Sequence, residues 1–123
     1  MNLNASSKGD AAEALLIAEL LSRGLTVSLP FGQDQPYDVV TEHGKTGRLL
    51  KVQVKMRTNE LYPNVYKFGD LSRYVGKVDI MAFLCGGDWY FWTNLKLKRY
   101  GCEKEVLVKL KYNIKNNFKI FGV

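Results

Sequence analysis

Residues 36–57 read PYDVVTEHGKTGRLLKVQVKMR and are the most strongly patterned part of the chain. Runs rich in β-branched residues predict two strands, 37–42 and 48–58, and the glycine-containing segment 43–47 between them suits a tight hairpin turn. Apolar and polar residues alternate along the second strand, and every second side chain of a strand points to the same face. The stretch therefore predicts a β-hairpin with one buried face and one mostly polar face.

The register of this hairpin decides which polar side chains meet. If Gly44 faces Gly47 across the turn, Asp38 lies directly opposite Gln53, and Lys55 is the next residue on that face. A slip of one residue would move these side chains to different faces. The hairpin thus predicts a carboxylate, an amide and an ammonium group close together. Solvated Gln53 and Lys55 side chains on an amphipathic strand are the alternative interpretation.

A helix is predicted over residues 7–23, before the hairpin. At about 100° per residue, Glu13 falls in the middle of an apolar arc that comprises Leu16, Ile17, Leu20 and Leu21. A carboxylate buried without a partner is costly, so Glu13 should have one. A salt bridge, or a position at the fringe of the first turn, is one explanation. The other is that the core face of the helix overlooks a polar site.

Glu13, Asp38, Gln53 and Lys55 together suit the hydrolysis of a phosphodiester bond. The two carboxylates and the amide offer oxygen ligands of the kind that Mg²⁺ prefers. Lys55 would then lie beside the attacking water, where a cation stabilises the charge that develops on phosphorus. We therefore expect Glu13, Asp38 and Gln53 to bind the metal and all four residues to be catalytic.

The remaining sequence predicts further strands and one short helix. Strand-like patterns cover residues 25–31, 78–85, 89–93 and 105–112. Residues 59–77 are polar and rich in tyrosine, with a short helix near 71–75, and residues 115–123 have no clear pattern. A helix, a run of strands and then mixed elements indicate an α/β domain.

Charge is distributed unevenly along the 123 residues. The chain has 18 Lys and Arg against 12 Asp and Glu, a net charge of +6. Residues 1–50 have a net charge of −2, and residues 51–123 have a net charge of +8. Such a basic surface favours a polyanionic partner, with nucleic acid as the first candidate and a merely solvated surface as the alternative. The length fits one domain, 1–123, with a single core.

Composition excludes several classes of protein. No apolar stretch approaches the roughly 20 residues needed to cross a bilayer, and the first residues are polar, so we expect a soluble, intracellular or cytoplasmic protein without a membrane partner. Two cysteines, Cys85 and Cys102, are too few for a disulfide framework and lack the spacing of a zinc site. His43 is the only histidine, which excludes a Ser-His-Asp triad and a multi-histidine metal site.

Four positions, in order along the chain, resemble the PD-(D/E)XK nuclease superfamily. They are Glu13 in the helix, Asp38 in Pro36-Tyr37-Asp38, and both ends of Gln53-Val54-Lys55. The match covers about residues 7–58 and is most similar to the small branch that includes group I intron homing endonucleases, and more distantly to archaeal Holliday junction resolvases. There are two departures. Gln53 replaces the acidic residue of the motif, and Tyr37 stands where its proline would be, with Pro36 one place earlier.

The resemblance implies a restriction-endonuclease-like α/β core with a central mixed β-sheet flanked by helices. It also implies a Mg²⁺-dependent DNA endonuclease, with Mn²⁺ as an alternative ion, that is site-specific in the manner of homing or restriction enzymes. A Holliday junction resolvase and a DNA-binding module with a degenerate site are the alternatives. Since one chain has one active site, cutting both strands implies a homodimer or higher homo-oligomer. For DNA contact we expect basic and tyrosine residues of the second hairpin strand and the following segment, namely Lys51, Arg57, Tyr66, Lys67, Arg73, Tyr74 and Lys77.

Overall fold

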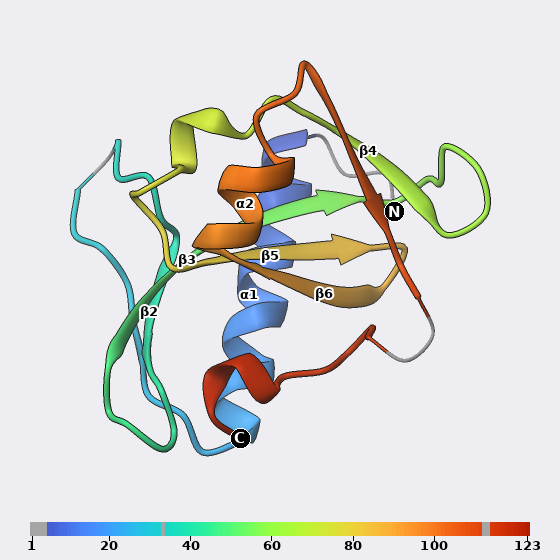
Figure 1. Cartoon of the computed structure of the whole chain (residues 1–123). Helices are drawn as coiled ribbons and strands as arrows, with labels where there is room; N and C mark the ends of the chain where they lie inside the picture. Colours follow the sequence, from blue (N-terminus) through green and yellow to red (C-terminus); the bar gives the residue numbers. More distant parts are fainter. Residues whose placement is uncertain (1–4, 33, 112–113) are drawn as a thin grey trace.

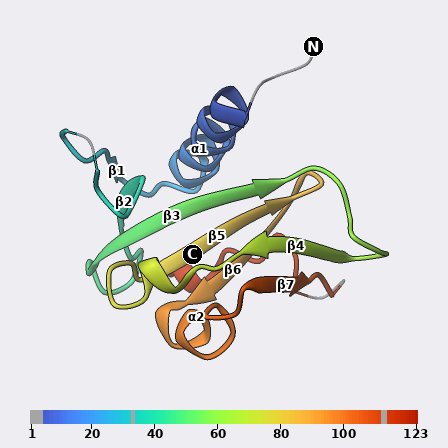
Figure 2. The same ribbon diagram turned by 90° about the horizontal axis from the view of Figure 1, so that it is seen from above.

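The structure, a computed structural model, describes residues 5–32, 34–111 and 114–123. Its elements form three layers (Figures 1 and 2). A long helix, α1 (Ala5–Ser22), covers one face of a five-stranded sheet, and helix α2 (Asn94–Tyr100) covers the other face together with a two-stranded sheet. Each interface between layers has its own cluster of buried apolar side chains, so the central sheet is apolar on both faces.

The predicted hairpin is present with the predicted register. Strands β2 (Val39–Glu42) and β3 (Leu49–Arg57) are antiparallel, and Val39 lies opposite Val52. The turn between them ends at Gly47, whose φ of +73° lies in the left-handed region that glycine adopts without strain. Burial alternates along most of β3, as the sequence pattern predicts. The prediction of the register is therefore confirmed.

The central sheet has the strand order β1-β2-β3-β5-β6. Its other strands are β1 (Val27–Ser28), β5 (Ile80–Cys85) and β6 (Asp88–Thr93). Strand β3 is parallel to β5, and all other neighbouring pairs are antiparallel. Every residue of β5 is buried, because layers cover both of its faces. The predicted class, an α/β fold with a central mixed sheet flanked by helices, is confirmed.

Helix α1 packs on the sheet with a face slightly different from the predicted one. Its fully buried side chains are Ala12, Leu16 and Leu20. Leu21, which the predicted apolar arc includes, is 54% exposed. The buried face is therefore centred on Ala12, Leu16 and Leu20, to one side of the predicted arc. Glu13 consequently lies at the margin of the buried face and not at its centre. No helix among the described residues is long and apolar enough to span a membrane.

The layer on the α2 side contains two elements that the sequence pattern did not predict. They are strand β4 (Val65–Gly69) and helix α2, whose N-cap Thr93 accepts a hydrogen bond from the N–H of Lys96 at 3.2 Å. The predicted short helix is present as the 3₁₀ helix η1 (Ser72–Tyr74). Strand β7 (Glu105–Lys109) pairs antiparallel with β4. The apolar side chains of this layer form the second core against the sheet.

The C-terminal segment completes the core on the α1 side. It contains a short 3₁₀ helix, η2 (Lys119–Phe121), and the Phe121 ring packs on Phe91 of β6 with 5.1 Å between ring centroids. The segment passes so close to the hairpin turn that a Cβ on Gly44 would lie 2.7 Å from the carbonyl oxygen of Gly122. Only glycine fits at position 44, because a side chain would collide with backbone.

One predicted strand is much shorter than its pattern suggests. Residues 25–31 alternate like a half-buried strand, but only the two residues of β1 pair with β2, and Leu29 and Phe31 are exposed, Phe31 fully so. Alternation does not make a strand where the backbone has no partner to pair with. Strand β7 is likewise shorter than the predicted 105–112, of which Tyr112 lies outside the described residues.

Candidate active site

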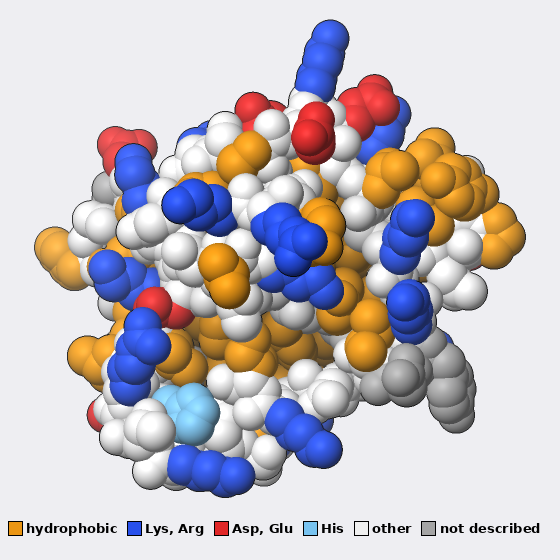
Figure 3. Space-filling model, in the orientation of Figure 1, with side chains coloured by type: hydrophobic (Ala, Val, Ile, Leu, Met, Phe, Trp, Pro, Cys, Tyr) orange, Lys and Arg blue, Asp and Glu red, His pale blue; other side chains and the backbone are white. Residues whose placement is uncertain are grey.

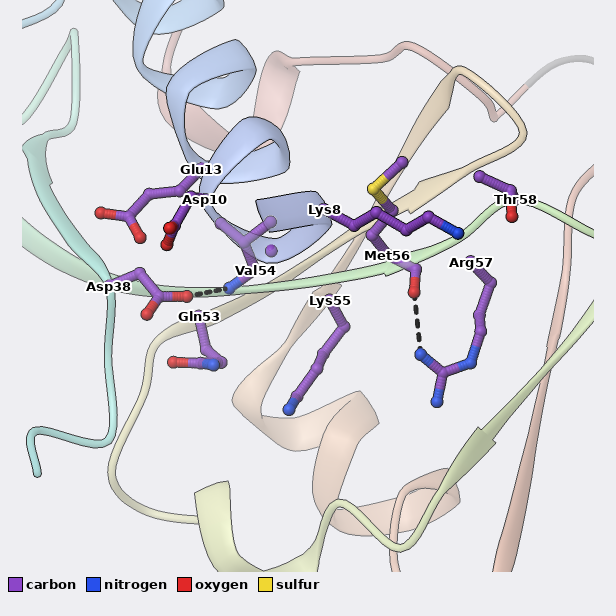
Figure 4. A pocket seen from close by; sticks show the side chains of 11 residues that line it. Lys8, Asp10, Glu13, Asp38, Gln53, Val54, Lys55, Met56, Arg57 and Thr58 are labelled. Carbon is purple, nitrogen blue, oxygen red and sulfur yellow. Dashed lines mark hydrogen bonds between the residues drawn. The ribbon is translucent and has the colours of Figure 1, made fainter. Parts of the chain in front are cut away.

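A cleft of about 450 Å³ lies where the first turns of α1 face strand β3. Figure 4 shows side chains from these two elements and from the residue before β2 gathered around it. The lining residues are Lys8, Gly9, Asp10, Glu13, Asp38, Gln53, Val54, Lys55, Met56, Arg57 and Thr58. The four residues that the sequence predicts to be catalytic are thus brought together at one cleft.

Asp38 is held by backbone hydrogen bonds at both its main chain and its side chain. It precedes β2 by one residue, and its N–H donates to the carbonyl of Val52 at 2.8 Å. Its Oδ2 accepts a hydrogen bond from the N–H of Val54 at 2.9 Å (Figure 4). Since both partners belong to the middle of β3, the carboxylate is fixed beside Gln53, where the register puts it.

Helix α1 brings two further carboxylates to the cleft. Asp10 and Glu13 are three residues apart and therefore lie on the same side of the helix. In Figure 4 both lie above β3, on the side of Asp38. Asp10 and Lys8 are absent from the site that the sequence predicts. The spacing of Asp10 from Glu13 is the feature that could have identified Asp10.

The pKa values of two carboxyl groups in the cleft, Glu13 and Asp38, are raised above their usual values. Burial raises the pKa of Glu13, and repulsion from Asp38 and Asp10 raises it further. Burial also raises the pKa of Asp38; the hydrogen bond from Val54 and the charge of Lys55 lower it in part, and Asp10 raises it. The net shift of the pKa is upward for both groups. Burial is the main cause of both shifts, and repulsion between the acidic side chains of the cleft adds to it.

Gln53 and Lys55 reach the cleft from the face of β3 opposite to the one that packs on α1 (Figure 4). Both side chains are half-buried. The Nζ atom of Lys55 lies 5.1 Å from the centre of the Tyr74 ring, which is a cation–π distance. Asp38 lies at the point where β2 separates from β3. The acidic groups on one side of β3 and Lys55 on the other side therefore both reach the cleft near Asp38.

The set of oxygen donors fits a hard divalent cation. Glu13 and Asp38 are anionic donors and Gln53 can add a neutral one, which is the ligand chemistry of Mg²⁺ or Mn²⁺. A cation between the carboxylates would also relieve the repulsion that raises the pKa of Glu13. Among the described residues, no three Asp, Glu, His or Cys side chains are close enough to hold a metal by themselves. The Gln53 amide, water or phosphate would have to complete the coordination shell.

The residues predicted to contact DNA divide into two groups. Tyr66 and Tyr74 are only 7% and 2% exposed, because their rings pack in the second core, and so they are corrected to core residues. The other members are exposed; they are Lys51, Arg57, Lys67, Arg73 and Lys77. The Arg57 guanidinium lies 4.9 Å from the Phe68 ring and donates to the Lys67 carbonyl at 3.1 Å, which ties β3 to β4.

The fold and the cleft together define a restriction-endonuclease-like nuclease. The sequence model of the PD-(D/E)XK endonuclease family matches residues 3–81, a region that contains α1, the hairpin and every residue of the cleft. The chain belongs to the PD-(D/E)XK endonuclease family. Nucleases of this family generally use divalent metal ions.

Solved structures with the same fold include two nucleases. The bacterial homing endonuclease I-Ssp6803I is 22% identical with a TM-score of 0.67, and the match covers 98% of this chain and 88% of that one. Hjc, a Holliday junction resolvase from the archaeal hyperthermophile Archaeoglobus fulgidus, is 24% identical with a TM-score of 0.61, over 94% of this chain and 96% of that one. No curated protein sequence matches the chain. The resemblance predicted from the sequence motifs is confirmed.

Proposed function

We propose that the chain is a Mg²⁺-dependent DNA endonuclease, with Mn²⁺ as an alternative ion, and that residues 1–123 form one nuclease domain. The proposal rests on the convergence of Glu13, Asp38, Gln53 and Lys55 on one polar cleft. Carboxylates from separate elements approach each other there although repulsion contributes to the raised pKa of Glu13. Such an arrangement is typical of a cation site, since the ion offsets the repulsion when it binds.

Asp38, Glu13 and Gln53 would hold the metal ion. Asp38 is the most firmly placed of the three, because two backbone hydrogen bonds from and to β3 fix it. When bound, the ion supplies positive charge that favours deprotonation of water and stabilises the charge on phosphorus. Gln53 stands where the family motif has an acidic residue, so the ligand set has one negative charge fewer. We therefore expect weaker metal binding than an all-carboxylate site would give.

Lys55 would orient the attacking water. Its ammonium group is half-buried against the Tyr74 ring, on the face of β3 from which Gln53 also reaches the cleft. From there Nζ can donate hydrogen bonds both to a water molecule and to a phosphate oxygen. Because partial burial reduces screening by solvent, this charge acts more strongly on the reacting atoms than a fully solvated lysine would.

The exposed basic residues would bind the DNA backbone. Lys51 precedes the cleft residues along β3, and Arg57 lines the cleft at the end of that strand. Lys67, Arg73 and Lys77 follow in the segment from β4 to η1 and beyond. Contacts to phosphates fix the position of a protein on DNA without reading its sequence. The described residues form one cleft of this kind per chain, so cutting both strands would require a homodimer or a higher homo-oligomer.

A site-specific homing or restriction-like enzyme is the first candidate for the biological role, and a Holliday junction resolvase is the second. The second candidate is favoured by the similarity to the archaeal resolvase, whose fold this chain matches over 94% of its length. The two roles differ in substrate and not in chemistry, because both hydrolyse phosphodiester bonds. The shape of the DNA that is cut would separate them.

The test is a cleavage assay with supercoiled plasmid and with a four-way junction, in Mg²⁺ and in EDTA. We expect cutting in Mg²⁺ only, and its loss in the Lys55→Ala variant. Lys45→Ala is the matched control, because Lys45 is an exposed lysine of the hairpin turn outside the cleft. A plasmid library with randomised inserts covers the case of a rare target site. Cutting that persists in EDTA or in Lys55→Ala would contradict the proposed mechanism.

A DNA-binding module with a degenerate site is the alternative from another functional class. In that case Gln53 would mark the loss of the metal site, and the basic residues alone would act. A titration of the protein with Ca²⁺, which supports binding in many Mg²⁺ sites, distinguishes the two. Perturbation of NMR signals of Asp38 and Glu13, together with tighter DNA binding, supports the enzyme. Salt-sensitive DNA binding without any response to the ion supports the module.

A further inference from the structure

Strand β7 has one edge that no strand covers. The second sheet consists of β4 and β7 only, so within the described residues β7 has a strand partner on one side. The direction of its backbone groups follows from one contact, in which the N–H of Leu110 donates to the carbonyl of Asn64 at 2.8 Å. Because N–H and C=O groups alternate sides along a strand, the even-numbered residues face β4. The odd-numbered residues Glu105, Leu107 and Lys109 therefore direct their N–H and C=O groups to the uncovered edge.

The side chains along this edge have a symmetrical pattern of charge. Leu107 is the centre, with Glu105 and Lys109 two residues away on either side, and Glu103 and Lys111 four residues away. All five side chains are exposed, and Leu107 is 39% exposed. Each acidic residue thus has a basic residue at the same distance on the other side of Leu107.

Charges on an uncovered strand can either prevent or favour pairing with a second copy of the same strand. Proteins commonly protect an uncovered strand by placing charges on it, which repel an incoming copy. When two identical strands pair antiparallel about Leu107, however, Glu105 of one copy faces Lys109 of the other, and Glu103 and Lys111 lie beyond the paired strands with the same complementary signs. Opposite charges directly across from each other stabilise a pair of strands, whereas like charges destabilise it. The charges on β7 therefore favour self-pairing and do not protect against it.

The backbone geometry agrees with the charge pattern. An antiparallel pair centred on Leu107 joins Leu107 to Leu107 and Glu105 to Lys109, and these are the residues whose N–H and C=O groups face the uncovered edge. All of them would be hydrogen-bonded pairs. A centre at Val106 or Val108 would also pair odd-numbered residues across this edge, so the backbone alone permits these neighbouring registers. The backbone therefore allows pairing through this edge, and the charges favour the register about Leu107, in which Glu105 faces Lys109.

The surroundings of the edge combine apolar and charged side chains. A groove of about 650 Å³ runs between β7 and the α2–β6 side of the molecule, and its apolar lining includes Tyr90, Trp92, Tyr100 and Ile114. In Figure 3, which shows the face of the molecule with α2 and β7 in front, apolar surface is visible between the scattered Lys and Arg side chains. A second chain laid along β7 would cover part of this surface, which adds a hydrophobic contribution to pairing.

We propose that β7 is the surface through which two copies of this chain associate, by antiparallel pairing of β7 with β7 about Leu107. The result is a continuous four-stranded sheet, β4-β7-β7-β4, with a two-fold axis at Leu107. The proposal deepens the proposed function, because it locates the dimer that cutting of both strands requires. None of the five edge residues lines the cleft, so association and catalysis can be tested separately.

The test is sedimentation equilibrium of the full chain and of charge-reversal variants. Wild type is expected to sediment at twice 14.0 kDa. Glu105→Lys and Lys109→Glu each place like charges opposite each other at two symmetrical points, so each should weaken association about tenfold or more. A mixture of the two variants should restore the dimer, because every introduced charge then faces an opposite one. The double variant E105K/K109E should also dimerise.

Lys109→Glu is the more informative single variant. Within one chain, Glu105 Oε1 lies 3.8 Å from Lys67 Nζ, so reversing the charge of Glu105 also removes an ion pair to β4. Lys109 has no ion pair among the described residues. Leu107→Arg, which places two arginines at the axis, is a second way to break the pair. Thermal melts establish that each variant is folded. Lys104→Glu is the matched control, an exposed lysine outside the symmetrical set.

Three results would overturn the interface. They are a monomeric wild type at all concentrations, a dimer that Lys109→Glu and Leu107→Arg leave intact, and a mixture of charge variants that remains monomeric. Cleavage assays on the same samples keep the two proposals apart. A monomeric variant with an intact cleft should still nick one strand of a supercoiled plasmid while its double-strand cutting falls. A wild type that dimerises through β7 but cuts no DNA would contradict the proposed function and leave the interface standing.

Discussion

Two regions of the molecule bring residues together in different ways. Helix α1, β2 and β3 place a few chemically distinct side chains around one cleft. Replacing one of these side chains, even by a similar one, should change what the cleft can bind or catalyse. The layer of α2, β4 and β7 instead presents many lysines and arginines, each of which resembles its neighbours. The net charges of −2 for residues 1–50 and +8 for residues 51–123 follow this division in part, since Lys51, Lys55 and Arg57 of β3 belong to the basic half. A single substitution should therefore disable cleavage by the first region, whereas DNA binding by the second should fall clearly only when several charges are removed.

The largest effect is expected from Asp38→Asn. The asparagine keeps an oxygen that can accept the hydrogen bond from Val54, so the local fold is preserved, but the anionic metal ligand is lost. Cleavage should fall about a thousandfold, the scale seen when a group that stabilises the transition state is removed. DNA affinity in EDTA should stay the same or rise, since a negative charge leaves the DNA-facing cleft. Single-turnover cleavage and a DNA titration measure the two quantities separately.

Asp79→Asn is the matched control for this substitution. Asp79 also accepts a backbone hydrogen bond from β3, at the N–H of Lys51 (2.9 Å), and its other oxygen pairs with Arg48. It does not line the cleft. The same chemical change there should leave cleavage unaltered at a temperature where the variant is folded. Equal losses in both variants would mean that Asp38 acts through stability and not through the metal.

A smaller effect should follow from removing three basic residues at once, Lys67, Arg73 and Lys77, by substitution with alanine. DNA affinity should fall about tenfold at moderate salt, and the slope of log affinity against log salt should decrease by about 0.9 for each phosphate that is no longer neutralised. Cleavage at saturating DNA should change little. A triple alanine variant of the exposed residues Lys45, Lys98 and Lys119 has the same loss of charge and serves as the control. Identical affinities of the two variants would argue against a defined DNA-binding surface.

The same division explains what could be predicted from the sequence. The hairpin register follows from two glycines at a fixed spacing and from strict alternation along β3, both of which are local features. Once the register is known, the proximity of Asp38 to Gln53 and Lys55 follows directly. The position of Asp10 in the cleft is less direct, because its spacing from Glu13 shows only that both lie on one side of the helix and not that Asp38 approaches that side.

The second region depends on contacts between distant residues. Strand β4 lies in a polar segment, and its partner β7 begins only at Glu105. Because the two strands are far apart in the sequence, no local pattern predicts that they pair. Helix α2 has seven residues and is stabilised by the Thr93 cap and the burial of Leu97, which are too few features for a periodic pattern. The tyrosines of this region were misassigned to DNA for the same reason. Their basic neighbours are exposed, and only the packing of the layer shows that the rings of Tyr66 and Tyr74 face inward.

The smallest effect concerns the stability of the metal-free protein, which the ionised acidic residues of the cleft should lower at neutral pH. Because the pKa of Glu13 is raised in the folded state, its contribution to stability is present at acid pH, below the unfolded-state pKa, and is lost as the pH rises through the folded-state pKa. Glu13→Gln removes this loss. In EDTA the variant should melt about 2 °C above wild type at neutral pH, and the difference should vanish at acid pH, where Glu13 is protonated.

Glu19→Gln, on the same helix, is the control that gives this measurement its meaning. Glu19 pairs with Arg23 on the surface, so its neutralisation should bring no gain at neutral pH. Mg²⁺ should raise the melting temperature of wild type and do so less for Glu13→Gln, since the ion binds the folded state only through the cleft. A Glu13→Gln variant that melts below wild type in EDTA would mean that Glu13 already has a cationic partner. In that event the repulsion of Glu13 by Asp38 and Asp10, which a bound metal ion would relieve, would be absent. Glu13 would then be a structural residue like Glu19.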